Sequence, residues 1–236
     1  MCMTPSVIKN PVFPQLFPTR QAIVDEFRKF KPAFSPEFIE IVLSNDSPTL
    51  EELKEATALE PTKNTWGIYL LFMEITDIPP GLYTGSGTNS DRGIGNRMRD
   101  YERGVSLPRQ VKQYLDLGFD ITHHKVLMST TMPSPEDFTL CRAFLRLLEA
   151  TIIFGFWTVH SIFDTEKYQY VMERASFWDR DELEWKGLNA NTPLAKDLGV
   201  NANLMPEERE EKAKMAKERK RENSRRSANW GWTGER

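Results

Sequence analysis

The sequence has few cysteines and no long apolar run, and both absences limit what the protein can be. Two cysteines among 236 residues, Cys2 and Cys141, cannot build a disulfide framework. Cys141 lies in an apolar segment, so we expect a buried free thiol there. No stretch reaches the roughly 20 apolar residues of a membrane span, and the N-terminus lacks the basic-then-apolar pattern of a secretion signal. We therefore expect an intracellular protein with no membrane partner.

Neither sign of charge dominates the chain. Lysine and arginine number 31 against 34 aspartate and glutamate residues, which gives a net charge of −3. This balance excludes a chain that is basic throughout, but a local basic face remains compatible with it. With 39% hydrophobic and 11% aromatic residues, the composition is typical of a folded globular protein rather than a disordered one.

The composition changes along the chain and divides it into four parts. These are a helical N-terminal arm at 1–62, a central domain at 63–163, a Trp-rich extension at 164–205, and a charged helical or disordered tail at 206–236. In the arm, Thr19 is a plausible N-cap for a helix that runs to about Lys31. Ser35-Pro36 and Ser47-Pro48 announce two further helices, since serine caps helices and proline is tolerated in the first turn.

The central domain shows both strand and helix patterns. Strands are predicted at 65–74, 82–84 and 121–129, and helices at 93–102 and from Ser134 to about Phe156. The triplet at 85–87, Gly-Ser-Gly, lacks the full spacing of a phosphate-binding loop, so we interpret it as a turn that ends the second strand. The last helix is apolar almost all round, which predicts a buried position.

A set of polar residues stands on these elements in a particular order. Gly67-Ile68-Tyr69 lies in the first strand and Tyr83-Thr84-Gly85 in the second; Arg97 and Tyr101 follow one helical turn apart, and Glu149 lies on the apolar helix. Each has an ordinary alternative. The tyrosines are also typical packing residues, and Arg142, Arg146 and Glu149 have the spacing of one charged helix face with a plain ion pair.

This order resembles the GIY-YIG endonuclease superfamily, over roughly residues 65–157. The resemblance implies an α+β fold with a small three-stranded antiparallel sheet flanked by helices, and hydrolysis of a nucleic-acid phosphodiester with one divalent cation, Mg²⁺ or Mn²⁺. It also implies the site residues. The catalytic candidates are Tyr69, Tyr83, Arg97, Tyr101 and Glu149, and Gly67, Gly85 and Asn189 are possible additions.

The chemistry of phosphodiester hydrolysis agrees with these residue types. The reaction needs an activated water and neutralisation of the charge that develops on the phosphate. Tyr69 or Tyr83 would serve as base or water positioner, which requires that a nearby cation, the metal or Arg97, lower a tyrosine pKa from about 10. The planar fork of Arg97 suits a phosphate, and the Glu149 carboxylate is an oxygen ligand of the kind that Mg²⁺ prefers.

The sequence also departs from the family pattern. The second triplet has Thr84 at its centre where an aliphatic residue is usual, and the loop that follows is longer than in compact members. The family often has an asparagine about a dozen residues after the glutamate, where this chain has Ser161. Asn189 is the nearest candidate, although a turn or cap role fits it equally well.

Two basic segments are candidates for holding the substrate. Between 92 and 112, six basic residues face two acidic ones; besides Arg97 the basic set comprises Arg92, Arg99, Arg103, Arg109 and Lys112. The alternative is a solvated helix face. The second segment, 212–226, is a DNA-contacting arm, a nuclear-import signal or a solvated tail. A eukaryotic source would place the protein in the nucleus, and a prokaryotic one in the cytoplasm.

The sequence therefore predicts a metal-dependent endonuclease that acts on nucleic acid, with DNA favoured. The alternative is a catalytically decayed nucleic-acid-binding or adaptor protein on the same scaffold, because the usual asparagine is missing and the flanking segments are strongly charged.

Overall fold

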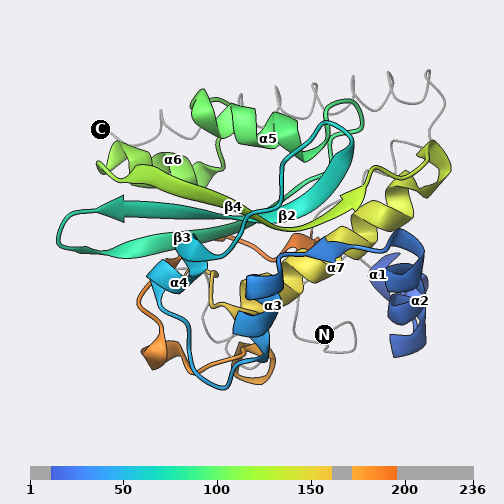
Figure 1. Ribbon diagram of the computed structural model, residues 1–236, viewed down its shortest axis with the longest axis horizontal. Helices are drawn as coiled ribbons and strands as arrows, with labels where there is room; N and C mark the ends of the chain where they lie inside the picture. The colour runs from blue at the N-terminus through green and yellow to red at the C-terminus, as the bar shows by residue number, and fades with distance from the viewer. Residues whose placement is uncertain (1–11, 161–171, 196–236) are drawn as a thin grey trace, which may run out of the picture. The chain divides into compact units, whose positions relative to one another are not determined.

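The computed structural model describes residues 12–160 and 172–195, which lie within one compact unit, Met1–Lys196 (Figure 1). The chain is α+β. Predictions that fall at 1–11, 161–171 and 196–236 lie outside the described residues, among them Cys2, Ser161 and the basic segment at 212–226. The proposed division of the chain at residues 62, 163 and 205 stays a prediction.

The sheet is larger than the sequence predicted. Its strands are β1 (Ala33–Phe34), β2 (Thr65–Ile75), β3 (Ile78–Gly87), β4 (Asp120–Thr131) and β5 (Lys186–Gly187), in the spatial order β1-β4-β2-β3-β5. The expected three-stranded antiparallel sheet is therefore wrong, since the sheet has five strands and is mixed: β5 runs parallel to β3. The two additional strands have two residues each, too few to show any alternation of polar and apolar residues.

The hairpin of β2 and β3 carries both sequence triplets. Tyr69 lies opposite Gly85, and Leu71 lies opposite Tyr83. Because directly opposed residues point to the same face of a sheet, these four share one face. β3 is also longer than expected and continues through Ser86 to Gly87, so the triplet interpreted as a turn is part of the strand.

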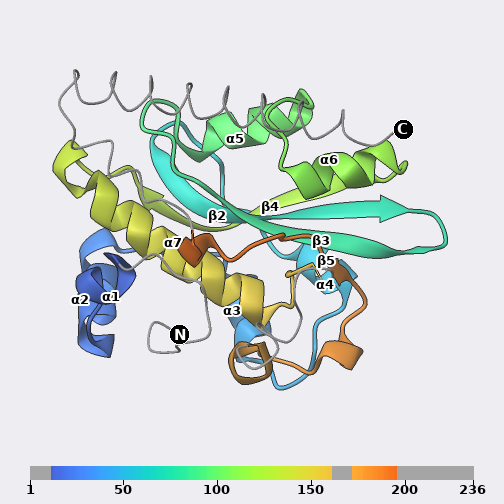
Figure 2. The same cartoon turned by 180° about the vertical axis from the view of Figure 1, so that it is seen from behind.

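Helices cover both faces of the sheet. One face packs against α5 (Gly93–Glu102) and α6 (Arg109–Asp116), and the other against α7 (Phe138–Gly155), as Figure 1 and the reverse view in Figure 2 show. Trp66, Ile68 and Leu70 of β2 enter the core on the α7 side. Tyr69, Leu71 and Met73 enter the core on the α5 side. This pattern explains the nearly continuous apolar run of β2, which is buried on both faces.

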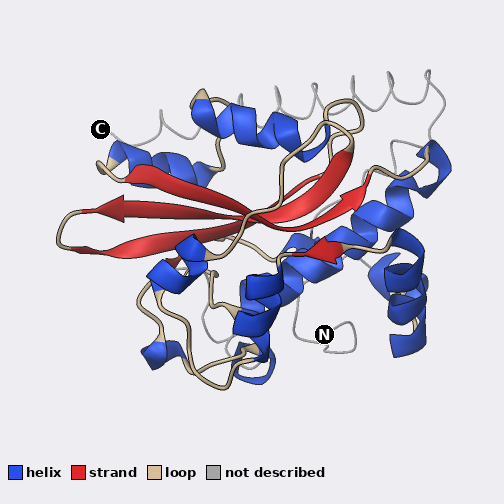
Figure 3. Ribbon diagram, in the orientation of Figure 1, coloured by secondary structure: helices blue, strands red, loops and turns tan. Residues whose placement is uncertain are grey.

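The N-terminal helices are α1 (Val12–Leu16), α2 (Arg20–Phe30), α3 (Pro36–Leu43) and α4 (Leu50–Glu55), shown in blue in Figure 3. Thr19 and Ser35 are confirmed as N-caps, since each side-chain oxygen accepts a backbone N–H in the first turn. The third cap is Thr49 rather than Ser47, because Thr49 and Glu52 form a reciprocal capping box. Contacts to the core include stacking of Phe38 on Phe156.

The long helix α7 begins later than its serine-proline signal suggests. Residues Pro135–Asp137 form a 3₁₀ turn, η1, and the α-helix starts at Phe138. Cys141 lies buried on α7 as expected, and burial raises the pKa of its thiol to about 12. Among the residues described here, no helix combines the length and apolar character needed to cross a membrane.

The segment 172–195 folds back along the hairpin. It contains two 3₁₀ turns, η2 (Arg180–Glu182) and η3 (Pro193–Ala195), on either side of β5. The buried indole of Trp185 donates to the carbonyl of Phe156, and the backbone N–H of Leu188 donates to the carbonyl of Leu82. The chain after α7 thus adds to the core and returns to the outer edge of β3.

Candidate active site

Two tyrosines and a glycine lie side by side on the α5 face of the β2–β3 hairpin. The rings of Tyr69 and Tyr83 have centroids 6.5 Å apart, and both side chains are buried. Gly85 lies directly opposite Tyr69, and a Cβ atom added at Gly85 would overlap the Tyr69 hydroxyl. The absence of a side chain at Gly85 therefore gives the Tyr69 ring its place across the strand.

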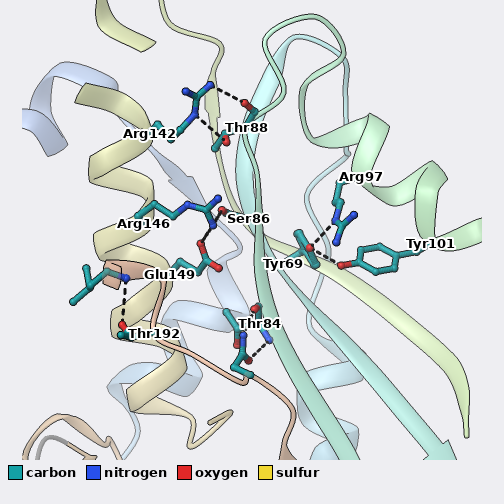
Figure 4. Close-up of polar contacts among 12 residues, drawn as sticks. Tyr69, Thr84, Ser86, Thr88, Arg97, Tyr101, Arg142, Arg146, Glu149 and Thr192 are labelled. Carbon is teal, nitrogen blue, oxygen red and sulfur yellow. Dashed lines mark hydrogen bonds and ion pairs between the residues drawn. The ribbon is translucent and has the colours of Figure 1, made fainter. Parts of the chain in front are cut away.

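The helix α5 brings two further candidates onto this face. Tyr101 and Tyr69 share a hydrogen bond between their hydroxyl oxygens, 2.7 Å apart, and Arg97 Nε donates to the Tyr69 hydroxyl at 3.2 Å (Figure 4). Arg97 and Tyr101 are one helical turn apart, so both point at the same strand. The structure thus brings Tyr69, Tyr83, Arg97 and Tyr101 together, and the hydroxyl of Tyr69 meets Tyr101 rather than Tyr83.

Several groups fix the guanidinium of Arg97. Its carbon lies 4.6 Å from the centroid of the Tyr101 ring, and Nη1 donates to the carbonyl of Ser106 at 2.7 Å. Nη1 also lies 3.8 Å from an Asp100 carboxylate oxygen. These contacts occupy one face of the guanidinium, against the Tyr101 ring, and the nitrogens Nε and Nη1. The Arg97 side chain keeps 23% of its surface exposed.

Burial controls the protonation of the tyrosines. It raises the pKa of Tyr69, Tyr83 and Tyr101 above the ordinary value, because an ionised phenolate is poorly stabilised away from water. The charge of Arg97 lowers the pKa of Tyr69, but by less than burial raises it. All three side chains therefore carry neutral hydroxyls at physiological pH, and the expected lowering of a tyrosine pKa is not present in this state.

Glu149 lies on the opposite face of β3 from the tyrosines. Ser86 follows Gly85 directly, so its side chain points to the other face of the strand, toward α7. The Ser86 hydroxyl donates to Glu149 Oε2 at 2.8 Å, and Arg146 Nη1 donates to the same oxygen at 2.6 Å (Figure 4). The ion pair that the helix spacing allows is thus present. From the other face of the strand, the negative charge of Glu149 raises the pKa of Tyr69 and Tyr83.

The donor set near Glu149 fits a hard divalent cation in chemical type. The carboxylate and the Ser86 hydroxyl both offer oxygen, the ligand atom that Mg²⁺ and Mn²⁺ prefer. The described residues contain no group of three or more His, Cys, Asp or Glu side chains that could hold a metal ion. A cation at Glu149 would therefore take the rest of its coordination shell from water and substrate phosphate, as Mg²⁺ commonly does.

Asn189 returns to the second triplet from far along the chain. Its side-chain oxygen accepts the backbone N–H of Thr84 at 2.9 Å, and its nitrogen donates to the Thr84 carbonyl at 2.6 Å. The amide thus replaces a neighbouring strand for this one residue, between Tyr83 and Gly85. The Thr84 hydroxyl bonds to that of Thr158 at 3.0 Å, which gives the unusual threonine of the triplet a buried polar partner.

The remaining candidates divide into packing residues and surface residues. Gly67 allows close contact, because a Cβ atom there would overlap the carbonyl oxygen of Met128. The five further basic residues are all exposed on or beside α5 and α6, namely Arg92, Arg99, Arg103, Arg109 and Lys112. The basic strip is thus solvent-facing on the same side of the sheet as Arg97.

The sequence argument missed two residues that contact the candidate site. The sequence predicts a turn at Ser86. A strand that continues to Gly87 places Ser86 and Gly85 on opposite faces of the sheet, so the strand pattern could have identified Ser86. Ser106 contributes only its backbone carbonyl, so no side-chain pattern could have identified it. Its positive φ of 53° belongs to the turn that brings this carbonyl to Arg97.

We compared the chain with known proteins and found no family model, no curated protein and no solved structure that matches it. The resemblance of the ordered residues to the GIY-YIG superfamily therefore stays a prediction, and the functional argument depends on the geometry of the two clusters on either side of β3.

Proposed function

We propose that this protein is a metal-dependent endonuclease that hydrolyses phosphodiester bonds in nucleic acid, with DNA as the favoured substrate. The observation that carries the proposal is the contact of Arg97 and Tyr101 with the hydroxyl of Tyr69, which lies against Gly85. The next residue of the strand, Ser86, donates its hydroxyl to Glu149. Residues from four separate elements, β2, β3, α5 and α7, supply hydroxyls, a guanidinium and a carboxylate around the end of β3.

The outer edge of β3 is the route by which one phosphate would reach both clusters. β5 pairs only with Gly81 and Leu82, and the Asn189 side chain pairs with Thr84. In the described part of the chain, backbone pairing along this edge therefore ends before Ser86. The exposed basic residues of α5 and α6 supply the positive charge that attracts a polyanion, which supports binding on this side.

Each residue has a role that follows from its contacts. Arg97 donates to a phosphate oxygen and stabilises the charge that grows there, since its fork matches a phosphate and its position is fixed by Tyr101 and Ser106. Tyr69 keeps its proton at Oη and orients a water molecule by hydrogen bonding. Tyr101 holds the Tyr69 hydroxyl in place. A divalent cation bound to Glu149 would supply Lewis-acid activation of the phosphate.

The test is cleavage of supercoiled plasmid DNA with Mg²⁺ or Mn²⁺ and with EDTA. We expect cleavage only with the metal, and none from Glu149→Gln, which keeps a hydrogen-bonding partner for Ser86 and Arg146. The control is Glu136→Gln, at an exposed carboxylate in η1, which should cleave like the natural protein. Undiminished cleavage by Glu149→Gln would overturn the assignment. Cleavage of a panel of duplex, branched and single-stranded DNA and RNA by the natural protein identifies the preferred substrate.

A second candidate function is nucleic-acid binding without cleavage. Two observations favour it: Arg146 occupies the Glu149 carboxylate, and burial keeps all three tyrosines protonated. Salt-sensitive binding of DNA, with no cleavage of any substrate in Mg²⁺ or Mn²⁺, would favour this function over the first.

A further inference from the structure

The carboxylate of Glu149 already has a positively charged partner. Arg146 Nη1 lies 2.6 Å from Glu149 Oε2, and it also donates to the Ser86 hydroxyl at 3.0 Å. The Glu149 side chain is 1% exposed, whereas the Arg146 side chain is 19% exposed. Burial of a lone carboxylate is strongly unfavourable, so this guanidinium is what makes an ionised Glu149 acceptable inside the protein.

A cation that binds Glu149 must therefore compete with Arg146. Both are positively charged, and Arg146 already contacts Glu149 Oε2 and the Ser86 hydroxyl, two of the oxygens that a cation at this position would use. Two cations at one buried carboxylate repel each other, so arrival of one favours departure of the other. If a cation displaces Arg146 from Glu149, the guanidinium needs another anionic partner. Besides carboxylates, phosphates are the groups with which arginine forms paired hydrogen bonds.

Arg146 differs in this respect from Arg142, one helical turn earlier on α7. Arg142 donates through Nε to the Thr88 hydroxyl and through Nη2 to the Thr88 carbonyl, and it lies over the ring of Trp66. No described contact joins Arg142 to Glu149. Arg146 is thus the arginine whose partners would be exchanged, while Arg142 stays in place.

We propose that Arg146 is a phosphate-binding residue that serves as the counter-ion of Glu149 until nucleic acid arrives. The inference rests on the proposed function for the identity of the phosphate. In the resting protein Arg146 occupies the carboxylate; when the backbone of the substrate reaches the edge of β3, Arg146 turns to a phosphate and the carboxylate becomes free to bind the divalent cation. Metal and nucleic acid then bind cooperatively, and linkage requires that each raise the affinity of the other by the same factor.

The first test measures Mn²⁺ binding alone, by the electron paramagnetic resonance signal of free Mn²⁺, in the natural protein, Arg146→Gln and Arg142→Gln. We expect Arg146→Gln to bind Mn²⁺ about tenfold more tightly, the scale of one hydrogen bond to a charged group. Arg142→Gln should differ from the natural protein by less than about twofold, because its lost contacts are with Thr88. The gain should vanish when Glu149→Gln is added. Equal affinity of Arg146→Gln and the natural protein would overturn the proposal.

Thermal unfolding reports whether the variants fold. Arg146→Gln leaves a buried carboxylate without its counter-ion, so we expect a lower Tm that Mn²⁺ restores, whereas Mn²⁺ should shift the Tm of Arg142→Gln no more than it shifts that of the natural protein. If Arg146→Gln does not fold, Arg146→Lys replaces it. Lysine keeps the charge but has no fork to bridge Ser86 and Glu149, so a smaller gain of about threefold is expected, and no gain would overturn the proposal.

The second test measures duplex DNA binding in EDTA, where no metal-dependent cleavage occurs. Loss of one phosphate contact in Arg146→Gln should weaken binding and reduce the slope of log Kd against log salt by about one unit. Arg142→Gln should keep the slope. An unchanged slope for Arg146→Gln would contradict the phosphate role.

The outcomes separate this inference from the proposed function. A natural protein that cleaves DNA, with no gain in Mn²⁺ affinity in Arg146→Gln, would overturn the exchange and leave the nuclease function intact. A gain in Mn²⁺ affinity that depends on Glu149, in a protein that cleaves no nucleic acid, would support the counter-ion role and overturn the nuclease function.

Discussion

The two faces of β3 differ in the kind of polar chemistry that they hold. On the α5 face, three protonated tyrosines lie in one core cluster, and the Arg97 guanidinium contacts the hydroxyl of Tyr69 and the ring of Tyr101. On the α7 face, a guanidinium and a carboxylate form a short ion pair bridged by Ser86. Gly85 and Ser86 are neighbours in sequence, and the alternation of a strand assigns one to each face.

This difference separates two tasks that a phosphodiester reaction combines. On the α5 face, the carboxylate that pairs with Arg97 among the described residues is that of Asp100, which lies 3.8 Å away and is partly exposed. Under the proposed function, Arg97 is the group that receives the phosphate. The α7 face is electrically satisfied, so it binds a new charge only by exchange. We therefore expect substitutions on the α5 face to lower the reaction rate directly, and substitutions on the α7 face to change the binding of the cation.

The largest expected effect concerns Arg97. Arg97→Ala should lower the single-turnover cleavage rate by roughly a hundredfold or more, the scale of losing a preorganised donor in the transition state. Arg99→Ala, two residues along the same helix, removes an exposed cation and should change binding only modestly. The rates are compared at saturating enzyme, with Tm values as the check on folding. Equal rates for the two variants would show that Arg97 is not at the reacting phosphate.

A matched pair of stability variants compares the two faces at adjacent residues. Gly85→Ala places a methyl group against the Tyr69 hydroxyl and the Tyr83 ring, so we expect a loss of roughly 1–3 kcal/mol in the free energy of unfolding. Ser86→Ala leaves the direct Arg146–Glu149 contact in place and should cost roughly 1 kcal/mol or less. Urea unfolding measures both. A larger loss for Ser86→Ala would mean that the bridged ion pair, rather than tyrosine packing, determines the position of this strand.

The last comparison is a dependence on alkaline pH that belongs to the α5 face. The pKa of Tyr69, Tyr83 and Tyr101 is raised in the folded state above the ordinary value of 10.0. The stability that this difference contributes is fully present below pH 10.0 and falls as the pH rises further, because the unfolded chain then loses protons that the folded chain keeps.

Urea unfolding between about pH 8 and pH 11 tests this dependence, with a slope of up to about 1.4 kcal/mol per pH unit for each tyrosine. Tyr101→Phe should make the slope shallower, since phenylalanine has no proton to lose. Glu136→Gln, at an exposed carboxylate in η1, should keep the natural slope. A slope that Tyr101→Phe leaves unchanged would mean that the tyrosines do not determine the alkaline limit.

The sequence was sufficient for the elements that carry long periodic patterns. The two triplets fall on paired strands, and Arg97 and Tyr101 share one helix face, because alternation and the helical repeat extend over many residues there. β1 and β5 escaped notice because two residues show no period. The contact of Asn189 with Thr84 was equally beyond reach, since it joins positions 105 residues apart and depends on the path of the whole chain.

The division of the site between two faces had a partial signal. Alternation alone would have separated Ser86 from Gly85 once β3 was extended, but the glycines at 85 and 87 argued for a turn at the end of this strand. The protonation of the tyrosines depends on their burial in the core on the α5 side of the sheet. No local sequence pattern indicates that burial raises the pKa of the Tyr69 hydroxyl by more than the neighbouring charge of Arg97 lowers it.

The amide of Asn189 also covers part of the outer edge of β3. A strand whose outer N–H and C=O groups are free is a template for pairing with a second chain. β5 and the Asn189 side chain occupy those groups at Gly81, Leu82 and Thr84. A chain shortened to end after α7 would keep both triplets, Arg97 and Glu149, yet would present the outer edge of β3 bare. We therefore expect the segment 172–195 to limit pairing between copies of the protein along the same strand on which the candidate site is built.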